Sequence, residues 1–130
     1  MNTQNVIDKF RGKILGNQAT KKIIAETLLL LPEKTIEDLS KHVWFMSSFD
    51  DAWAYTFRGN DLKGKKMIFL SDELLSQDKE SIQFTILHEV GHVVLNHRNS
   101  INFRQTREEV NKQEQEADKF AFRYLNQSFL

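Results

Sequence analysis

Residues 78–96, with the sequence DKESIQFTILHEVGHVVLN, decide how this chain is interpreted. Asp78 or Ser81 can cap a helix that runs to the end of this stretch, because the apolar residues within it recur at helical spacing. Residues four apart on an α-helix lie about one turn apart on nearly the same side, so His88 and His92 project together. We therefore expect one helix to present two imidazoles to a common point.

This pair of histidines has the spacing of a metal site. Zinc accepts imidazole ligands at about 2.0 to 2.2 Å, and a catalytic zinc site keeps one position for water. Glu89 lies beside that position, where a carboxylate can remove a proton from water and deliver it to a leaving amine. Gly91 removes a side chain next to the site, which favours close packing of a second helix or strand. We expect His88 and His92 to bind Zn²⁺ with Glu89 as general base, although manganese or iron could compete.

An acidic segment, EQEAD at residues 114–118, is the expected source of a third protein ligand. It belongs to a predicted last helix, about 106–127, on which Glu114 and Asp118 share a face. Glu114 is the predicted ligand, and Asp118 is predicted to accept the outer N–H of a histidine ligand. Glu116 stays open as the third ligand in place of Glu114. Taken alone, such a cluster is more typical of a solvated helix face.

The other histidines have no partner at metal-ligand spacing. His42 and His97 are each interpreted as surface or core residues, which is also the alternative for His88 and His92 themselves. His97 follows the motif helix and could line a cleft, as could Tyr124 on the last helix. Either side chain could then polarise a carbonyl.

The first third of the chain predicts helices. Apolar residues recur at helical spacing over about 3–31, which indicates one or two helices weakened in the middle by Gly12 and Gly16. Pro32 stops this pattern, and Thr35 then resembles the N-cap of a short helix through about residue 42.

A small sheet is expected next. Strand-like runs lie at 43–46, 53–57 and 67–70, and turn residues fill 59–64. The second and third strands should therefore form a hairpin. An edge of the 67–70 strand is the candidate to hold an extended peptide by backbone pairing.

Length and composition bound these expectations. The 130 residues fit a single domain with one core, divided into a helical segment at about 1–42, a sheet at about 43–71 and active-site helices at about 78–128. Eighteen basic and eighteen acidic residues balance without a long basic run, so direct nucleic-acid binding is not expected. Cysteine is absent, which excludes disulfides and thiolate metal sites and fits a reducing compartment. With no apolar signal-peptide core and no membrane-length apolar run, the expected location is cytoplasmic.

Three sequence blocks, in this order, carry a family resemblance: KMIFLS at 66–71, FTILHEVGH at 84–92 and EQEADKFA at 114–121. Across about 53–125 the chain resembles the ImmA/IrrE metallopeptidases. The resemblance implies the α+β class and a compact, zincin-like domain of gluzincin type. In such a domain a small three-stranded sheet packs on helices that include the HExxH helix.

The resemblance also implies roles. His88 and His92 match the ligating histidines, Glu89 the general base, Glu114 the downstream glutamate ligand, and Asp118 the residue that orients His88. Members of that family are typically encoded on phages, mobile elements or stress-response loci, where they cleave or inactivate a helix-turn-helix repressor. The expectation is a zinc-dependent endopeptidase whose partner is a separate repressor protein.

The alternative function is a non-catalytic, regulator-binding module that retains a metal site. Retention of Glu89 argues against it, because a binding module has no use for a general base. The sequence leaves the cleaved bond, the activating signal and the oligomeric state open.

Overall fold

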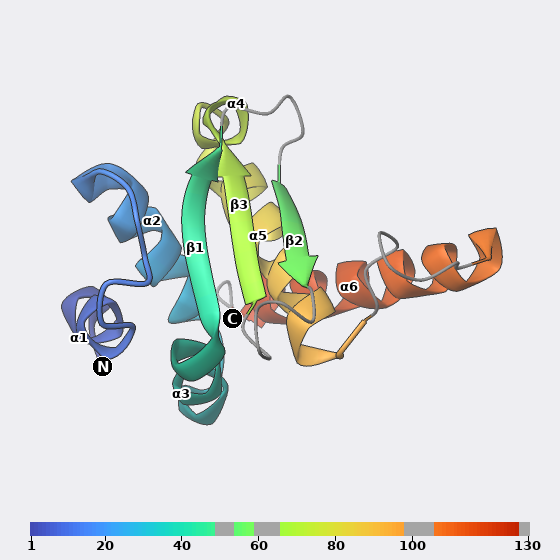
Figure 1. Ribbon diagram of the computed structural model, residues 1–130, viewed down its shortest axis with the longest axis horizontal. Helices are drawn as coiled ribbons and strands as arrows, with labels where there is room; N and C mark the ends of the chain where they lie inside the picture. The colour runs from blue at the N-terminus through green and yellow to red at the C-terminus, as the bar shows by residue number, and fades with distance from the viewer. Residues whose placement is uncertain (49–53, 59–65, 98–105, 128–130) are drawn as a thin grey trace.

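The computed structural model describes residues 1–48, 54–58, 66–97 and 106–127, which contain both helices and strands (Figure 1). In chain order the elements are α1 (Thr3–Lys9), α2 (Gln18–Leu28), α3 (Glu33–His42), β1 (Val43–Ser48), β2 (Ala54–Arg58), β3 (Lys66–Ser71), α4 (Asp72–Leu75), α5 (Lys79–Val94) and α6 (Arg107–Gln127). The predicted mixture of α and β structure is confirmed. Among the described residues, no helix combines the length and apolarity needed to cross a bilayer.

The first helical pattern forms two helices, α1 and α2. The Asn2 side chain accepts a hydrogen bond from the backbone of Asn5 at the start of α1, and the Asn17 side chain caps α2 in the same way. Between them, Gly12 and Gly16 have φ angles of 83° and 146°, in the region that favours glycine. The weak middle of the predicted pattern is therefore a turn that separates the helices.

The third helix begins earlier than the sequence indicated. Pro32, with φ of −58°, occupies the N-cap position of α3, and its side chain makes no capping hydrogen bond. The prediction that Thr35 caps this helix is wrong, because Thr35 lies inside α3. Proline is unfavourable inside a helix but is tolerated at its start, where its fixed φ angle suits the helix and its missing N–H leaves no hydrogen bond unmade. The predicted end at His42 is confirmed.

The short helix α4 was not expected. It begins directly after β3, where the Ser71 hydroxyl accepts a hydrogen bond from the backbone N–H of Leu74 at 3.1 Å. Leu74 is fully buried, so this single turn closes one end of the core.

The sheet has three strands in the order β1-β3-β2. β2 and β3 are antiparallel, as the predicted hairpin requires, and β1 runs parallel to β3. The central position of β3 makes one expectation wrong: the strand at 67–70 is hydrogen-bonded on both sides and offers no edge to a peptide. The turn residues at 59–64 and Trp53 lie outside the described residues.

One face of the sheet packs on the helices. Phe45, Ile68 and Leu70 are completely buried in the cluster that also contains Ile86 and Val90 of α5. In Figure 1, α5 lies behind the strands, on this side of the sheet. The core thus holds α5 in a fixed place below the sheet.

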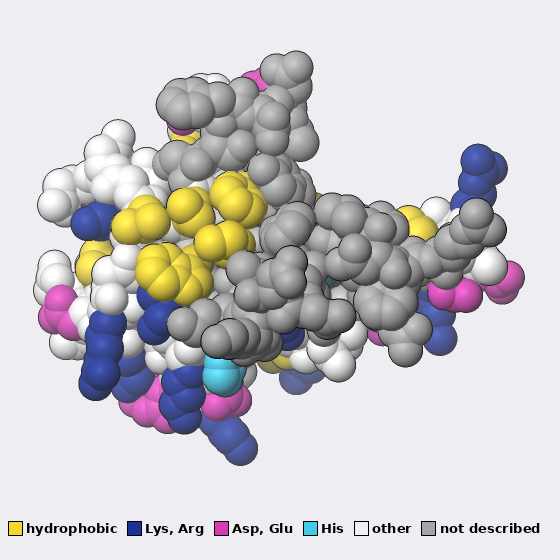
Figure 2. Space-filling model, viewed as in Figure 1, with side chains coloured by type: hydrophobic (Ala, Val, Ile, Leu, Met, Phe, Trp, Pro, Cys, Tyr) yellow, Lys and Arg dark blue, Asp and Glu magenta, His cyan; other side chains and the backbone are white. Residues whose placement is uncertain are grey.

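The opposite face of the sheet carries a second set of large side chains. Figure 2 shows hydrophobic side chains gathered over β1 and β3 on this face. Alternation along the two strands assigns four half-buried residues to it: Trp44, Met46, Met67 and Phe69. The site lies on the other side of the sheet from these residues.

Candidate metal centre

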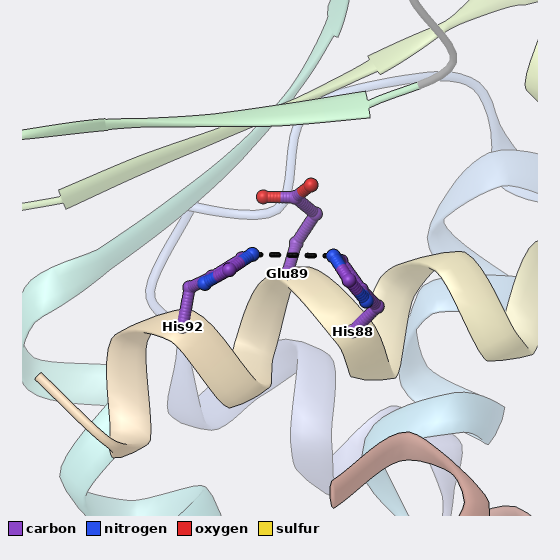
Figure 3. Close-up of side chains that lie close together, drawn as sticks. All are labelled: His88, Glu89 and His92. Carbon is purple, nitrogen blue, oxygen red and sulfur yellow. Dashed lines mark hydrogen bonds between the residues drawn. The ribbon is translucent and has the colours of Figure 1, made fainter. Parts of the chain in front are cut away.

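Helix α5 carries the first part of the candidate site. Of the two predicted caps, Asp78 is the one used: its carboxylate accepts a hydrogen bond from the backbone of Ser81. One nitrogen of His88, one carboxylate oxygen of Glu89 and one nitrogen of His92 lie within 4.8 Å of one another. Figure 3 shows the two imidazoles facing each other, with the Glu89 side chain rising between them toward the strands. These three residues could hold a metal ion.

The second part of the site comes from α6, which packs antiparallel to α5. A methyl group added to Gly91 would lie 3.1 to 3.2 Å from atoms of the Phe120 side chain, which is closer than ordinary contact. The predicted reason for a glycine at position 91 is therefore confirmed: a second helix approaches here. This contact sets which residues of α6 face the two histidines.

Glu114 lies against both histidines. Its Oε2 is 2.9 Å from Nε2 of His88, and its Oε1 is 3.2 Å from Nε2 of His92. Glu116 lies on another side of α6, where its Oε2 is 3.5 Å from Nε2 of His97. Of the two carboxylates left open by the sequence, the structure brings Glu114 to the point where the Nε2 atoms meet.

Asp118 lies one turn beyond Glu114 and contacts the other nitrogen of His88. Its Oδ1 is 2.8 Å from Nδ1 of His88, a distance typical of a charge-assisted hydrogen bond. Because a carboxylate only accepts, the proton belongs to Nδ1, and Nε2 of the neutral imidazole carries a lone pair.

Two imidazole nitrogens and one carboxylate therefore converge on one point. Nε2 of His88 and Nε2 of His92 are 3.1 Å apart, and the Glu114 carboxylate contacts both. Lone pairs at these distances repel unless a proton or a cation lies between them. Binding of a positively charged ion is the chemistry that this arrangement favours.

The surroundings of His92 change the pKa of its imidazole. Burial lowers its pKa below the usual value near 6.5, and the neighbouring His88 and His97 lower it further, while the charge of Glu114 acts in the opposite direction. A low pKa keeps the imidazole neutral near pH 7, which is the form that binds a metal.

His97 lies directly beside His92, and its suggested place in a cleft stays a prediction. Its side chain is only 8% exposed, and its Nδ1 lies 2.9 Å from Nδ1 of His92, on the side away from Nε2. Helical spacing does not predict this contact, because residues five apart do not face each other on a regular helix.

Tyr124, the other suggested cleft residue, packs within α6 and against the core. Its ring contacts that of Phe120 at a centroid separation of 4.9 Å, and the Arg123 guanidinium lies 5.3 Å from its centroid. The described contacts of Tyr124 are therefore those of a side chain that packs α6 against the core.

Two phenylalanines that were not predicted as site residues lie next to the histidines. Phe84, one turn before His88, lies with its ring centroid 6.3 Å from that imidazole and 4.9 Å from the ring of Phe122. Phe122 is 53% exposed. Helical spacing could have found both, since Phe84 precedes His88 by four residues and Phe122 follows Asp118 by four.

Comparison with known proteins bears on this same pair of helices. A family model described as Peptidase U49 matches residues 78–129, the segment that contains α5, α6 and every candidate residue of the site. No curated protein and no solved structure matches the chain significantly. The family match supports a peptidase. It does not show membership of the ImmA/IrrE family, which the three sequence blocks resemble.

Proposed function

We propose that the protein is a zinc-dependent endopeptidase, with His88, His92 and Glu114 as metal ligands and Glu89 as general base. The observation that carries the proposal is the convergence of two Nε2 atoms and one carboxylate within 2.9 to 3.2 Å of one another. The Peptidase U49 match over the same helices supports hydrolysis of peptide bonds.

The donor set fits zinc. Bonds of about 2.0 to 2.1 Å in a tetrahedral site place neighbouring ligand atoms about 3.3 Å apart, close to the separations found here. Two imidazoles and one carboxylate would hold the ion and leave it accessible to water. The carboxylate of Asp118 on Nδ1 of His88 holds that ring in the tautomer that binding needs.

The chemistry follows from the residues that would surround the ion. A zinc ion held by His88, His92 and Glu114 would supply positive charge that lowers the pKa of water toward about 7 and polarises the scissile carbonyl. Glu89, which is 8% exposed and lies between the histidines, accepts a proton from the attacking water. The water oxygen bonds to the carbonyl carbon, the C–N bond breaks, and Glu89 returns the proton to the leaving amine nitrogen.

We propose a protein substrate, a helix-turn-helix repressor or a similar regulator that is encoded separately from this chain. This part of the proposal rests on the three sequence blocks that resemble the ImmA/IrrE metallopeptidases. The balanced charge of the chain supports recognition of a protein in preference to direct binding of nucleic acid.

Metal content and cleavage test the two halves of the proposal separately. Wild-type protein should retain about one zinc per chain after dialysis, and His92→Ala should retain little. Glu89→Gln keeps the ligands and the size of the side chain, so it should bind zinc like the wild type but fail to cleave the regulator that the wild type cleaves.

The possible outcomes have distinct meanings. Absence of zinc from wild-type protein, even after supplementation, would overturn the metal site. Full activity of Glu89→Gln in a derepression assay would instead favour the non-catalytic, regulator-binding module.

A further inference from the structure

The end of α5 folds back on itself at Asn96. This residue has φ of 58°, in the left-handed region that asparagine tolerates better than most residues. The backbone N–H of His97 donates to the carbonyl of His92 at 2.9 Å, and that of Asn96 donates to Val93 at 3.1 Å. This pair of hydrogen bonds is the Schellman motif, in which the side chains of the first and last residues lie against each other.

In this chain the two side chains brought together by the motif are both imidazoles. Nδ1 of His92 and Nδ1 of His97 are 2.9 Å apart, and their ring centroids are 5.1 Å apart. A contact this short between two nitrogens requires that one of them donate a proton and the other accept it. His97 is 8% exposed, so its surroundings fix the ring against the histidine.

We infer that His97 is a positioning residue, which fixes the ring and tautomer of His92 for metal binding; the inference rests on the metal site proposed above. If Nε2 of His92 is a ligand, its proton is on Nδ1, and Nδ1 of His97 is the acceptor. The remaining proton of His97 is then on Nε2, 3.5 Å from the Glu116 carboxylate. That distance is long for a hydrogen bond, so Glu116 contributes mainly through its negative charge.

Both metal-binding imidazoles would thus be supported from α6, by different routes. His88 reaches the carboxylate of Asp118 directly, at 2.8 Å. His92 reaches the carboxylate of Glu116 through the ring of His97. This relay accounts for a buried histidine that the proposed catalytic steps do not use.

Two substitutions of His97 separate positioning from packing. His97→Leu retains an apolar side chain of similar bulk but removes the acceptor. His97→Asn is smaller, but its amide oxygen can lie close to the former position of Nδ1 and accept the proton of His92. Loss of a partner of a metal-binding histidine typically weakens metal affinity about 10- to 100-fold.

The experiment measures the zinc affinity of the full chain by competition with a chelator, and the melting temperature of each metal-free variant. We expect His97→Leu to bind zinc at least about tenfold more weakly than the wild type. His97→Asn should recover most of that loss even where its melting temperature is lower. In zinc-loaded protein, nitrogen NMR should show the proton of the His92 ring on Nδ1.

Each alternative result overturns a different statement. Equal zinc affinity of wild type and His97→Leu, or a weaker affinity of the Asn than of the Leu variant, would overturn the positioning role and leave the proposed function intact. Failure of the wild type to bind zinc would overturn the proposed function itself, and the positioning role with it.

Discussion

The N-terminal helices and the α5–α6 pair use buried space differently. In α1, its C-cap and α2, apolar residues such as Val6, Phe10 and Ile24 are fully buried, and the capping asparagines lie at the exposed ends of the helices. The α5–α6 pair also buries apolar residues, among them Val90 and Ala121, but imidazoles and carboxylates meet between these two helices. The difference indicates that the first region supplies stability, while the second combines apolar packing with a group of candidate metal ligands.

The largest effect on stability should come from the N-terminal core. Phe10 is fully buried and packs edge-to-face on Phe45, with ring centroids 5.8 Å apart. Phe10→Ala should reduce the free energy of unfolding by about 3 to 5 kcal/mol, because it leaves a cavity. Phe122→Ala, on the exposed side of α6, is the matched control and should cost far less. The unfolding free energies are measured by urea denaturation. Similar losses in the two variants would contradict the expected difference between the buried and the exposed phenylalanine.

Asp118 tests the other region through metal affinity. Removal of the carboxylate on Nδ1 of His88 should weaken zinc binding about 10- to 100-fold, or about 1.4 to 2.7 kcal/mol. Asp118→Asn keeps an acceptor without the charge and should fall between wild type and Asp118→Ala. Glu108→Ala, at an exposed position near the start of α6, controls for the loss of a negative charge. Zinc affinity is measured by competition with a chelator. Equal affinities of Asp118→Ala, Asp118→Asn and Glu108→Ala would contradict a role of Asp118 in zinc binding.

Gly91→Ala tests the approach of the helices. The added methyl group would press on the Cβ of Phe120, which is attached to the backbone of α6 and cannot rotate away. Alanine favours the helix by up to about 1 kcal/mol over glycine, so the net change in unfolding free energy should be within about 1 kcal/mol. Zinc affinity should fall more clearly, because α6 carries Glu114. An unchanged affinity would show that α6 can move without displacing this carboxylate.

The smallest effect should appear at the cap of α5. Hydrogen bonds from Ser81 lower the pKa of Asp78 below its ordinary value near 3.8. The charged carboxylate therefore stabilises the folded protein above that value, and this contribution disappears as the pH falls through the lower, folded-state pKa. Asp78→Asn keeps an acceptor but cannot titrate, so denaturation below about pH 4 should show a shallower loss of stability than in wild type. Parallel pH profiles would mean that the charge of Asp78 does not matter.

Local patterns predicted the elements that carry the site. The spacing of His88 and His92 and the apolar periodicity around them were sufficient to predict α5, and the turn residues between two strand-like runs were sufficient for the hairpin. The predicted start of α3 was wrong because Pro32 interrupts the preceding helical pattern and also occupies the N-cap position of α3. The order of the strands was not predictable, because β1 pairs with β3, which is distant in sequence.

The geometry of the site depended on tertiary structure. Glu114 and Glu116 differ by only two residues, and the register between α5 and α6, set where Gly91 meets Phe120, decides which of them faces the histidines. The contact of His97 with His92 needed the left-handed backbone of Asn96, a conformation that sequence periodicity does not reveal. Whether these residues bind zinc stays a prediction.

The placement of Glu114 on a different helix from the histidines has a consequence for the free protein. An ion held by both helices acts as a reversible cross-link, and its binding free energy adds to the stability of the closed arrangement in proportion to the logarithm of free zinc concentration. If the site binds zinc, α6 would detach more often when zinc is scarce and become accessible to proteases. The lifetime of the protein would then follow the supply of its own metal.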